Sequence, residues 1–346
     1  MKSSVGASLY RGIVKRRKTV LAVSILVTVL VFFVDVSLGP MRYGLAEVIQ
    51  AIFNPDPESV IYSVVWESRI PEALTALLVG LALGMAGAEM QTILDNPLAE
   101  PYTLGISTSA AFGASLVIAF GLGGSVFGDY AQPVLAFACA ILTCFVIYSV
   151  ARSRSGDRNT IILLGVAMLF LFQSLVSLIQ SVSSRDSANA IMFWMFGSLD
   201  RTEWVDLLII AVVIAIAAVF FAMNFWRLTA LRMGDSKARS LGVDVGRLRR
   251  NVLLAVSAVT ALAVSFAGTI GFVGLVGPHM ARMLVGEDQR FLMPMSAVCG
   301  ALMLLAAAIV CKLLESAVSL HIGVVTSLVG VPFFIYMIMR SRRSAA

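Results

Sequence analysis

The chain has 346 residues, of which 59% are hydrophobic and only 13% are charged, and its formal net charge is +6. A soluble domain carries about 25% charged residues, so this composition excludes an ordinary soluble enzyme or binding module. Several apolar segments exceed roughly 18 residues, the length that can span the hydrocarbon core of a bilayer. We therefore expect an all-α, polytopic membrane protein, because a transmembrane β-barrel would instead show short segments of alternating hydrophobicity.

The apolar segments predict ten transmembrane helices within a membrane domain that covers residues 19–340. In chain order they are 19–38, 72–94, 105–125, 131–151, 160–182, 204–226, 252–268, 270–285, 292–314 and 322–340. A basic tail (1–18) precedes the first span, which no small-residue cleavage site follows, so we expect this span to be retained. A basic loop (227–250) separates the sixth and seventh spans, and residues 341–346 form a C-terminal tail.

The distribution of positive charge predicts how the spans are oriented. If the N-terminus is cytoplasmic, 21 of the 26 Lys and Arg residues fall in cytoplasmic segments; the outer segments hold only Arg42, Arg69, Arg185, Arg201 and Lys312. Cytoplasmic loops of membrane proteins carry such an excess of basic residues. We therefore expect both termini to be cytoplasmic, and the net charge gives no reason to infer a nucleic-acid partner.

A weak internal repeat appears when the sequence is shifted by 181 residues. Ala86-Gly87 then falls on Ala267-Gly268, Leu94 on Leu275, and Pro97 on Pro278. The two copies would start on opposite sides of the membrane, and inverted repeats with Gly/Pro-interrupted helices are typical of transporters. Chance matching competes with this interpretation, because Ala and Gly are common in membrane helices.

A polar segment between the second and third spans has two prolines and no basic residue: Asp95-Asn96-Pro97-Leu98-Ala99-Glu100-Pro101. Irregular backbone at membrane depth is tolerated only where protein or a water-filled path satisfies its polar groups. The segment is thus predicted to lie at the cytoplasmic mouth of a translocation pathway. The alternative is a plain turn in which proline ends one helix before the next begins.

Long motifs resemble those of the FecCD/cobalamin-type permeases of ABC importers. They are R-I-P at 69–71, G-M-A-G-A-E-M-Q at 84–91, D-N-P-L-A-E-P at 95–101, F-W-M-F-G-S-L at 193–199, M-G-D-S-K-A-R-S-L-G-V-D-V-G-R at 233–247, G-T-I-G-F-V-G-L-V-G-P-H-M-A-R at 268–282 and I-G-V-V-T-S-L-V-G-V-P-F-F-I at 322–335. The motifs occur in the family's order and cover the chain from about residue 60 to 340.

The resemblance implies a type II ABC importer permease with ten transmembrane helices in the bacterial cytoplasmic (inner) membrane. It implies a second permease copy or paralogue, two ATPase subunits that bind ATP and Mg, and an extracytoplasmic substrate-binding protein. This chain contains no G-x-x-x-x-G-K-[ST] phosphate-binding loop, so we expect ATP to bind to another chain. It also has no His/Cys cluster and no constellation such as H-E-x-x-H, so we expect no catalytic residue, cofactor or metal on it. Ferric siderophore is the favoured ligand; haem and cobalamin are alternatives.

The basic 227–250 loop resembles the family segment that couples to the ATPase. Gly234 and Gly242 bracket about two helical turns, and Asp235 is placed to cap them. The predicted coupling residues are Gly234, Asp235, Ala238, Leu241 and Gly242. The alternative is a basic loop whose positive charge only orients the spans in the membrane.

Two basic residues are predicted to dock the binding protein, Arg69 and Lys312, and both lie where the sequence departs from the family. The family often reads R-L-P-R where this chain has Arg69-Ile70-Pro71-Glu72, so an arginine has become Glu72. In the ninth span the family's acid is lost, and Lys312 replaces an arginine. A lysine makes a point-charge contact without the bidentate fork of arginine, so we expect docking at the usual place with unusual chemistry.

Several polar residues are candidates for the pathway or its gate. They are Glu89, Gln91, Asn96, Pro97 and Leu98, together with the Asp157-Arg158-Asn159 loop. Glu89 stands where the family usually has an apolar residue, and a charge within the bilayer is costly unless it faces a cavity or a partner.

Other interpretations of the polar residues remain open. Glu89 could be a locally bonded structural carboxyl, or the proton site of an ion-gradient-driven transporter, which is the alternative from another functional class. For His279 a structural hydrogen bond is favoured over ligand contact, and for His321 a loop position without a ligand role.

Overall fold

The computed structural model describes residues 2–39, 41, 43–122, 128–153, 157–315 and 320–343, and in these residues it is all-helical. The α-helices are α1 (Lys2–Ser37), α2 (Leu45–Phe53), α3 (Val60–Tyr62), α4 (Ile70–Leu94), α5 (Ile106–Phe120), α6 (Ala131–Ser153), α7 (Arg158–Val182), α8 (Arg185–Met195), α9 (Trp204–Met223), α10 (Phe225–Leu231), α11 (Asp235–Ser240), α12 (Val245–Ala267), α13 (Val273–Val285), α14 (Gln289–Leu314) and α15 (Ile322–Arg343). A π-helical segment (Ser63–Arg69) leads into α4, and 3₁₀ turns occupy Pro101–Leu104 and Gly128–Tyr130.

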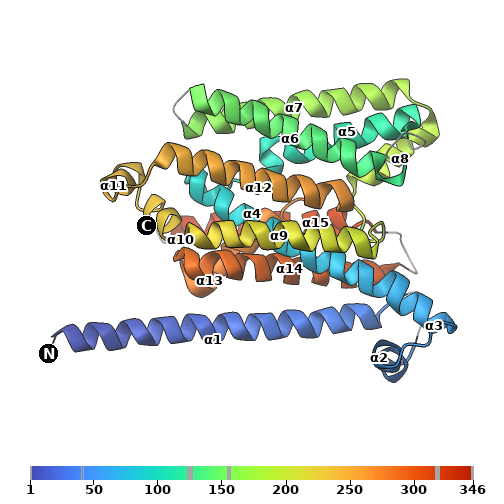
Figure 1. The fold of residues 1–346 in the computed structure, drawn as a ribbon, viewed down its shortest axis with the longest axis horizontal. Helices are drawn as coiled ribbons and strands as arrows, with labels where there is room; N and C mark the ends of the chain where they lie inside the picture. The colour runs from blue at the N-terminus through green and yellow to red at the C-terminus, as the bar shows by residue number, and fades with distance from the viewer. Residues whose placement is uncertain are drawn as a thin grey trace.

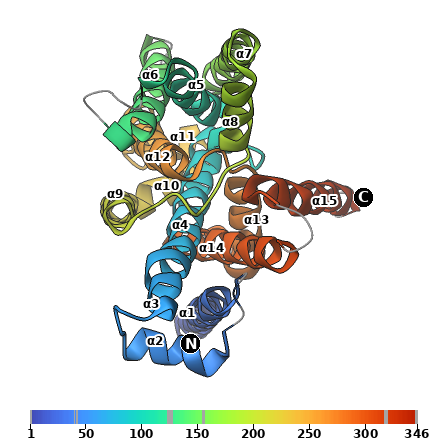
Figure 2. The ribbon, with the colours of Figure 1, turned by 90° about the vertical axis from the view of Figure 1, so that its right-hand side faces the viewer.

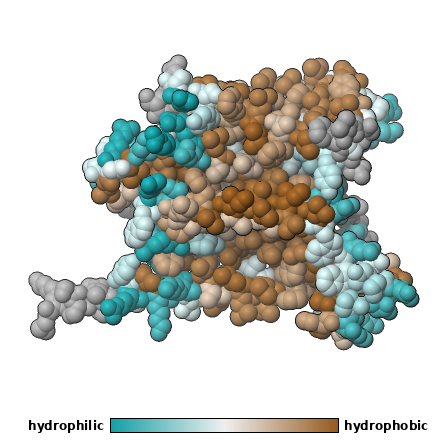
Figure 3. Space-filling model, in the orientation of Figure 1, coloured by the Kyte–Doolittle hydropathy of each residue, from teal (hydrophilic) through white to brown (hydrophobic). Residues whose placement is uncertain are grey.

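Each of the ten predicted spans corresponds to one helix: α1, α4, α5, α6, α7, α9, α12, α13, α14 and α15. Within the described part of the chain, seven helical stretches are long and apolar enough to cross a membrane, and α5, α13 and the apolar part of α15 are shorter. The long helices run roughly side by side (Figure 1). On the face shown in Figure 3, a hydrophobic band covers the middle of the molecule between two hydrophilic ends, as expected of a polytopic membrane protein.

The hydrophilic ends differ in the elements that they carry. The start of α1, the end of α15 and α11 lie at one end, which we call the α11 end; α2 and α3 lie at the other, the α2 end (Figure 1). Residues 2–18, predicted to be a tail, form the first half of α1. No proline interrupts the sequence from Lys2 to Ser37, so nothing stops the helix at the membrane boundary. At the other terminus α15 continues to Arg343, and residues 344–346 of the predicted tail lie outside the described part of the chain, as does Arg42.

Helix α4 lies at the centre of the bundle and packs against α12, α13 and α14 (Figure 2). Its glycines allow the backbones to approach closely. A Cβ added at Gly84 would lie 2.2 Å from the carbonyl oxygen of Ser296 in α14, and one added at Gly87 would lie 1.9 Å from that of Gly274 in α13. Small residues at helix contacts are the usual way in which membrane helices pack tightly, so the two glycines fix the position of α4.

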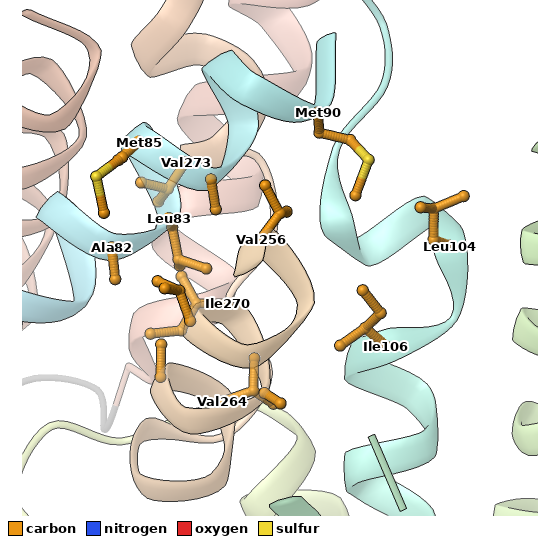
Figure 4. Close-up of a cluster of buried hydrophobic side chains, with 14 of the residues drawn as sticks. Ala82, Leu83, Met85, Met90, Leu104, Ile106, Val256, Val264, Ile270 and Val273 are labelled. Carbon is orange, nitrogen blue, oxygen red and sulfur yellow. The ribbon is translucent and has the colours of Figure 1, made fainter. Parts of the chain in front are cut away.

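The core around α4 is apolar and joins segments that are distant in sequence. Ala82, Leu83, Met85 and Met90 of α4 lie near Leu104 and Ile106, Val256 and Val264 of α12, and Ile270 and Val273 (Figure 4). All of these side chains are buried. The packing gives α4 and α12 a common core close to the polar segment that follows α4.

The predicted 181-residue repeat is not supported in its register. Helix α4 continues through Gly87 to Leu94, whereas the segment aligned with it is broken: α12 ends at Ala267, and α13 begins at Val273. Gly268 has a φ of +73°, which favours glycine and ends α12. Pro97 lies in a loop, but its aligned residue Pro278 lies inside α13. The aligned glycines and prolines therefore adopt different secondary structures, although Ala86 and Ala267, and Leu94 and Leu275, are all helical.

Candidate functional site

The predicted coupling segment folds into a short helix between two glycines. Gly234 and Gly242 have φ values of +100° and +82°, and α11 occupies Asp235–Ser240 between them. The prediction that Asp235 caps this helix is wrong, because Gly234 is the cap residue and Asp235 is the first helical residue. Its carboxylate is therefore free to bind side chains from other helices.

Two predicted coupling residues face opposite environments. The side chain of Ala238 is fully buried within the chain, whereas Leu241, at the end of α11, is 63% exposed. Lys237, Arg239 and Ser240 are also exposed. Ala238 thus anchors α11 to its own subunit, and the surface that α11 offers to a partner is basic with one apolar side chain.

Asp235 connects α11 to two transmembrane helices. Arg249 of α12 donates from Nη2 to both carboxylate oxygens of Asp235 at 3.1 Å, and its Nε donates to the carbonyl oxygen of Ile93 at 2.8 Å. Arg158 of α7 donates from Nη2 to Asp235 at 3.3 Å. Charge-assisted hydrogen bonds of this kind are about twice as strong as neutral ones, so movement of α11 would act on α4, α7 and α12.

The polar segment after α4 lies next to α11. Asp95 adopts the left-handed conformation, with a φ of +48°, and accepts a hydrogen bond from Nη1 of Arg158 at 2.6 Å. The side-chain oxygen of Asn96 accepts from the N–H of Leu98 at 3.0 Å, which fixes the turn. The side chains of Pro97 and Leu98 are exposed.

The Asp157-Arg158-Asn159 loop forms the start of α7. Asp157 is the cap of α7 and accepts from the backbone N–H and the hydroxyl of Thr160 at 2.8 and 2.9 Å. These hydrogen bonds lower the pKa of Asp157 below its usual value. Arg158 therefore extends from a fixed helix end toward Asp95 and Asp235.

Most of the predicted coupling and gate residues with polar side chains meet around one cavity of about 640 Å³ at the α11 end. Its lining consists of Leu94, Asp95, Asn96, Asp157, Arg158, Asn159, Ile162, Asp235, Arg239 and Arg249. The sequence placed these residues in four separate segments, and the fold brings them together. The cavity is lined by both acidic and basic side chains. The ion pairs between them would have to break if the four segments moved apart.

Glu89 and Gln91, the other predicted pathway residues, are fully buried within the chain, so neither faces an open path in this structure. Gln91 joins α4 to α13: its Nε2 donates to the carbonyl oxygen of Gly274 at 3.4 Å, and its Oε1 accepts from Nη2 of Arg282 at 2.9 Å. Among the described residues, neither carboxylate oxygen of Glu89 has a hydrogen-bond partner.

At the α2 end, the guanidinium of Arg69 binds groups of its own chain. It is 3% exposed, and its guanidinium donates to the carbonyl oxygens of Ser37, at 3.3 Å, and Met41. It also lies over the ring of Tyr43, 5.7 Å from the ring centroid. Arg69 therefore holds the end of α1, and in this structure it does not present its charge to a docking protein.

Lys312 is the centre of a buried ion triad. Its Nζ lies 3.1 Å from Oδ1 of Asp35 in α1 and 3.2 Å from Oε2 of Glu72 in α4. The side chain of Lys312 is 6% exposed and that of Asp35 is not exposed at all. The two departures from the family pattern, Glu72 and Lys312, are thus partners of each other, and the predicted outward contact of Lys312 is replaced by an interior one.

An open cavity of about 700 Å³ lies beside this triad, at the α2 end. Its charged lining residues are Arg69, Glu72, Asp200, Arg201, Lys312 and Glu315. His321, also in the lining, stacks on the ring of Phe193 with centroids 5.2 Å apart and contacts Phe196. The exposed charges here belong to Asp200, Arg201 and Glu315, so these residues, rather than Arg69 and Lys312, would meet a protein docked at this end.

Two residues of these sites were not predicted, Asp35 and Arg249. Each is a charged residue in or next to an apolar segment, and such a residue is a candidate functional site by default. For Asp35, near the end of the first predicted span, the sequence alone already indicated such a candidate. Arg249 lies in the basic 227–250 loop, where it could not be distinguished from the other basic residues.

Comparisons with known proteins identify the family of this chain. The model of the FecCD transport family matches residues 26–340. The chain is 35% identical over 316 residues to the iron(3+)-hydroxamate import system permease protein FhuB of Bacillus subtilis. The alignment covers 90% of this chain and 80% of that protein. It is 32% identical over 316 residues to the hemin transport system permease protein HmuU of Yersinia pestis, with coverages of 90% and 94%.

A solved structure described as an inward-facing conformation of a metal-chelate type ABC transporter has a similar fold. It superposes with a TM-score of 0.80 and 30% identity, and covers 93% of this chain and 99% of that one. The fold is thus that of a type II ABC importer permease, with multiple membrane-spanning helices. Together with the family match across nearly the whole sequence, this likeness establishes that the chain belongs to the FecCD transport family.

Proposed function

We propose that this chain forms the translocation pore for a ferric siderophore, as one of two permease subunits in an ATP-driven importer. The second subunit is another copy or a paralogue, and two separate ATPase subunits and an extracytoplasmic binding protein complete the assembly. The observation that carries the proposal is the bridge from Asp235 in α11 to Arg158, and from Arg158 to Asp95. This bridge links the segment predicted to meet the ATPase with the segment predicted to form the gate.

The exposed residues of α11 support contact with the ATPase. Lys237, Arg239 and Leu241 form a basic and apolar surface between Gly234 and Gly242. Such a surface fits a groove with acidic walls and an apolar floor on the ATPase. Binding of ATP would displace α11, and the ion pairs of Asp235 would pass the displacement to α7, α12 and the polar segment after α4.

Haem is the second candidate ligand, supported by the likeness to the hemin permease. Cobalamin remains an alternative from the sequence resemblance. An ion-gradient-driven transporter would need Glu89 to exchange protons with water on both sides of the membrane. Full burial of Glu89 within the chain argues against that mechanism.

The experiment that tests the proposal is reconstitution of the permease in vesicles with its ATPase and binding protein. We expect no ATP hydrolysis by the permease alone, and ATP-dependent uptake only when all components are present. Ferric hydroxamate siderophores, haem and cobalamin are compared as ligands. Equal uptake without the ATPase would contradict the proposal, and selective uptake of haem would favour the second ligand.

We further propose that the α11 end is cytoplasmic, in the cytoplasmic membrane. A cysteine introduced at Asp56 or Arg185 is expected to react with a membrane-impermeant maleimide added outside cells. One introduced at Lys237 is expected to react only after the membrane is opened. All three positions are exposed on the surface of this chain, so in cells without the ATPase, which would otherwise shield Lys237, their labelling reports access across the membrane. Outside labelling at Lys237 would contradict the orientation and the contact with the ATPase together.

A further inference from the structure

The first half of α1 carries a group of basic residues that the mechanism described so far does not use. Within about two helical turns it has Arg11, Lys15, Arg16, Arg17 and Lys18. No Asp or Glu precedes Asp35 in the sequence. Among the described residues, only Arg17 of this group has an ion-pair partner: its Nη1 lies 3.4 Å from Oδ2 of Asp288. Four positive charges are therefore not balanced by the described part of the chain.

One side of this part of α1 is fixed to the bundle. Val14 and Leu21 pack against a buried cluster of side chains from α13 and α14. Arg17 is three residues from one and four from the other, so it lies on the same face of the helix. Tyr10 accepts a hydrogen bond from Nη2 of Arg290 in α14 at 3.0 Å. These contacts fix how α1 is rotated about its axis, and with it the direction of the other basic side chains.

The four remaining basic side chains are exposed. Arg11, Lys15 and Lys18 are four and three residues apart, so they lie on one face of α1. Arg16 adds a fourth cation beside this face. We call these four residues the basic stripe. Because the contacts with the bundle are made by other residues of α1, the stripe is available to a partner outside the chain.

An exposed apolar surface continues the basic stripe along α1. Ala22, Ile25 and Val29 follow Lys18 at the same spacing of four and three residues, and all three are exposed. Residues 19–34 contain no charged side chain, as expected of the part of α1 that crosses the hydrocarbon core. One face of α1 therefore presents cations where the helix enters the membrane and apolar side chains within it.

Aromatic residues mark the same boundary. Tyr10 and Trp226 are 52% and 69% exposed. Arg290 contacts both of them, and its guanidinium lies 4.6 Å from the centroid of the Trp226 ring. Exposed Tyr and Trp side chains are typical of the headgroup level of a bilayer. Helix α1 extends beyond α13 and α14 at this end (Figure 1), so the basic stripe lies at the depth of the headgroups.

We propose that the basic stripe binds the phosphate groups of anionic phospholipids, whose acyl chains lie along the exposed apolar face of α1. Clusters of Lys and Arg next to a membrane span attract anionic lipids, and the long stems of these side chains let the cations reach the headgroups. A phospholipid fits both parts of this face, whereas a soluble anion would contact only the stripe. The bound lipid holds the first half of α1 at the membrane surface, and its binding does not depend on ATP-driven transport.

The test is a titration of the purified, full-length permease in detergent, with bound lipids counted by native mass spectrometry. Short-chain phosphatidylglycerol is the anionic lipid, and short-chain phosphatidylcholine is the zwitterionic one. Glycerol 3-phosphate, which has the phosphate without acyl chains, separates a lipid from a free phosphate. The triple variant Arg11→Gln, Lys15→Gln, Lys18→Gln removes three charges of the stripe. The triple variant Arg11→Lys, Lys15→Arg, Lys18→Arg keeps them.

The matched control removes the same number of charges elsewhere at the α11 end. It is the triple variant Arg152→Gln, Arg227→Gln, Arg247→Gln, whose residues are exposed and belong to α6, α10 and α12. The midpoint of thermal unfolding is measured for every variant. Because all the substituted side chains are exposed, it is expected to stay at the wild-type value.

The wild type is expected to bind phosphatidylglycerol at least about tenfold more tightly than phosphatidylcholine, and glycerol 3-phosphate more weakly than either effect requires for detection. Each Lys or Arg near an anionic lipid surface gains about fivefold in affinity. The neutral triple variant is therefore expected to bind phosphatidylglycerol at least about tenfold more weakly. The charge-keeping variant and the control are expected to stay within about twofold of the wild type, because the attraction depends on charge at this place.

Equal affinity of the wild type for the two lipids would overturn the proposal. So would an equal loss in the control, which would assign the effect to the total charge of the α11 end. Binding of glycerol 3-phosphate as tight as that of phosphatidylglycerol would mean a site for free phosphate instead. If the neutral triple variant does not fold, its three single substitutions decide the question, since each is expected to weaken phosphatidylglycerol binding about fivefold.

Discussion

Replacing Lys312 by methionine is expected to lower the free energy of unfolding by about 3–5 kcal/mol, as measured for removal of one partner from a buried ion pair. The substitution keeps the long apolar stem and removes the charge that lies between Asp35 and Glu72. Two carboxylates would then remain close together with no cation at the junction of α1, α4 and α14. The measurement is denaturant-induced unfolding of the purified protein in detergent.

Two further variants control this result. Arg247→Gln removes the cation of the pair with Asp244, whose side chains are 75% and 63% exposed, and is expected to cost only about 0–1 kcal/mol. Neutralising Asp35 and Glu72 in the Lys312→Met protein, by Asp35→Asn and Glu72→Gln, is expected to recover most of the loss. An unchanged free energy of unfolding in Lys312→Met would mean that the triad does not hold the three helices together.

The change of Asp235 to asparagine is expected to lower ligand uptake per ATP hydrolysed by about 10- to 100-fold. Asparagine has the same shape, but it replaces a carboxylate that binds Arg249 through both oxygens and also binds Arg158. Hydrogen bonds to charged groups contribute about 1.5–3 kcal/mol, and about 1.4 kcal/mol corresponds to a factor of ten. Uptake and ATP hydrolysis are measured together in the same vesicles.

Asp288→Asn is the matched control for this prediction. Asp288 is another aspartate at the α11 end that binds two arginines, Arg17 and Arg290. It lies outside the cavity that joins α11 to the polar segment. Its substitution should leave the ratio of uptake to hydrolysis near the wild-type value. An equal effect of both substitutions would indicate general damage at the α11 end rather than loss of the link through Asp235.

The charges at the α2 end have a consequence for the docking of a binding protein, if it docks there as proposed. Arg69 and Lys312 are bound to interior partners, and the exposed charges near the cavity of about 700 Å³ include two acids, Asp200 and Glu315. A binding protein that relies only on acidic residues would meet repulsion from these side chains. The departures at Glu72 and Lys312 therefore alter packing at the α2 end of the bundle as well as the charge offered to a partner.

The number and order of the spans could be predicted from the sequence, because a helix in a bilayer must bury its own backbone polar groups within a long apolar segment. The helix ends were less predictable. Residues 2–18 became part of α1, and the 227–250 loop proved to contain α10, α11 and the start of α12. Polar helices at the membrane surface lack the apolar signal, so their extent depends on contacts with the rest of the bundle.

The sequence predicted which residues would belong to the candidate site, but it predicted the contacts of only some of them. The coupling glycines and the polar segment after α4 were recognisable from motifs that are local in sequence. The neighbours that a side chain contacts, by contrast, depend on how distant helices pack around it. Glu89 and Gln91 lie two residues apart and were grouped as pathway residues. In the structure Gln91 binds the backbone of α13, whereas neither carboxylate oxygen of Glu89 has a hydrogen-bond partner among the described residues. Ala238 was expected to meet a partner and is buried in its own chain.

Apolar length, basic charge and motif order thus determined from the sequence alone that this is a multi-pass permease with a polar break between its second and third spans, and they predicted a coupling segment. Only the tertiary structure decided which charges pair. Ion pairs such as Lys312 with Asp35, and Arg158 with both Asp95 and Asp235, join residues between 63 and 277 positions apart. In a low-dielectric interior a charge is stable only beside its partner, and which partner comes within reach is fixed by the packing of the helices.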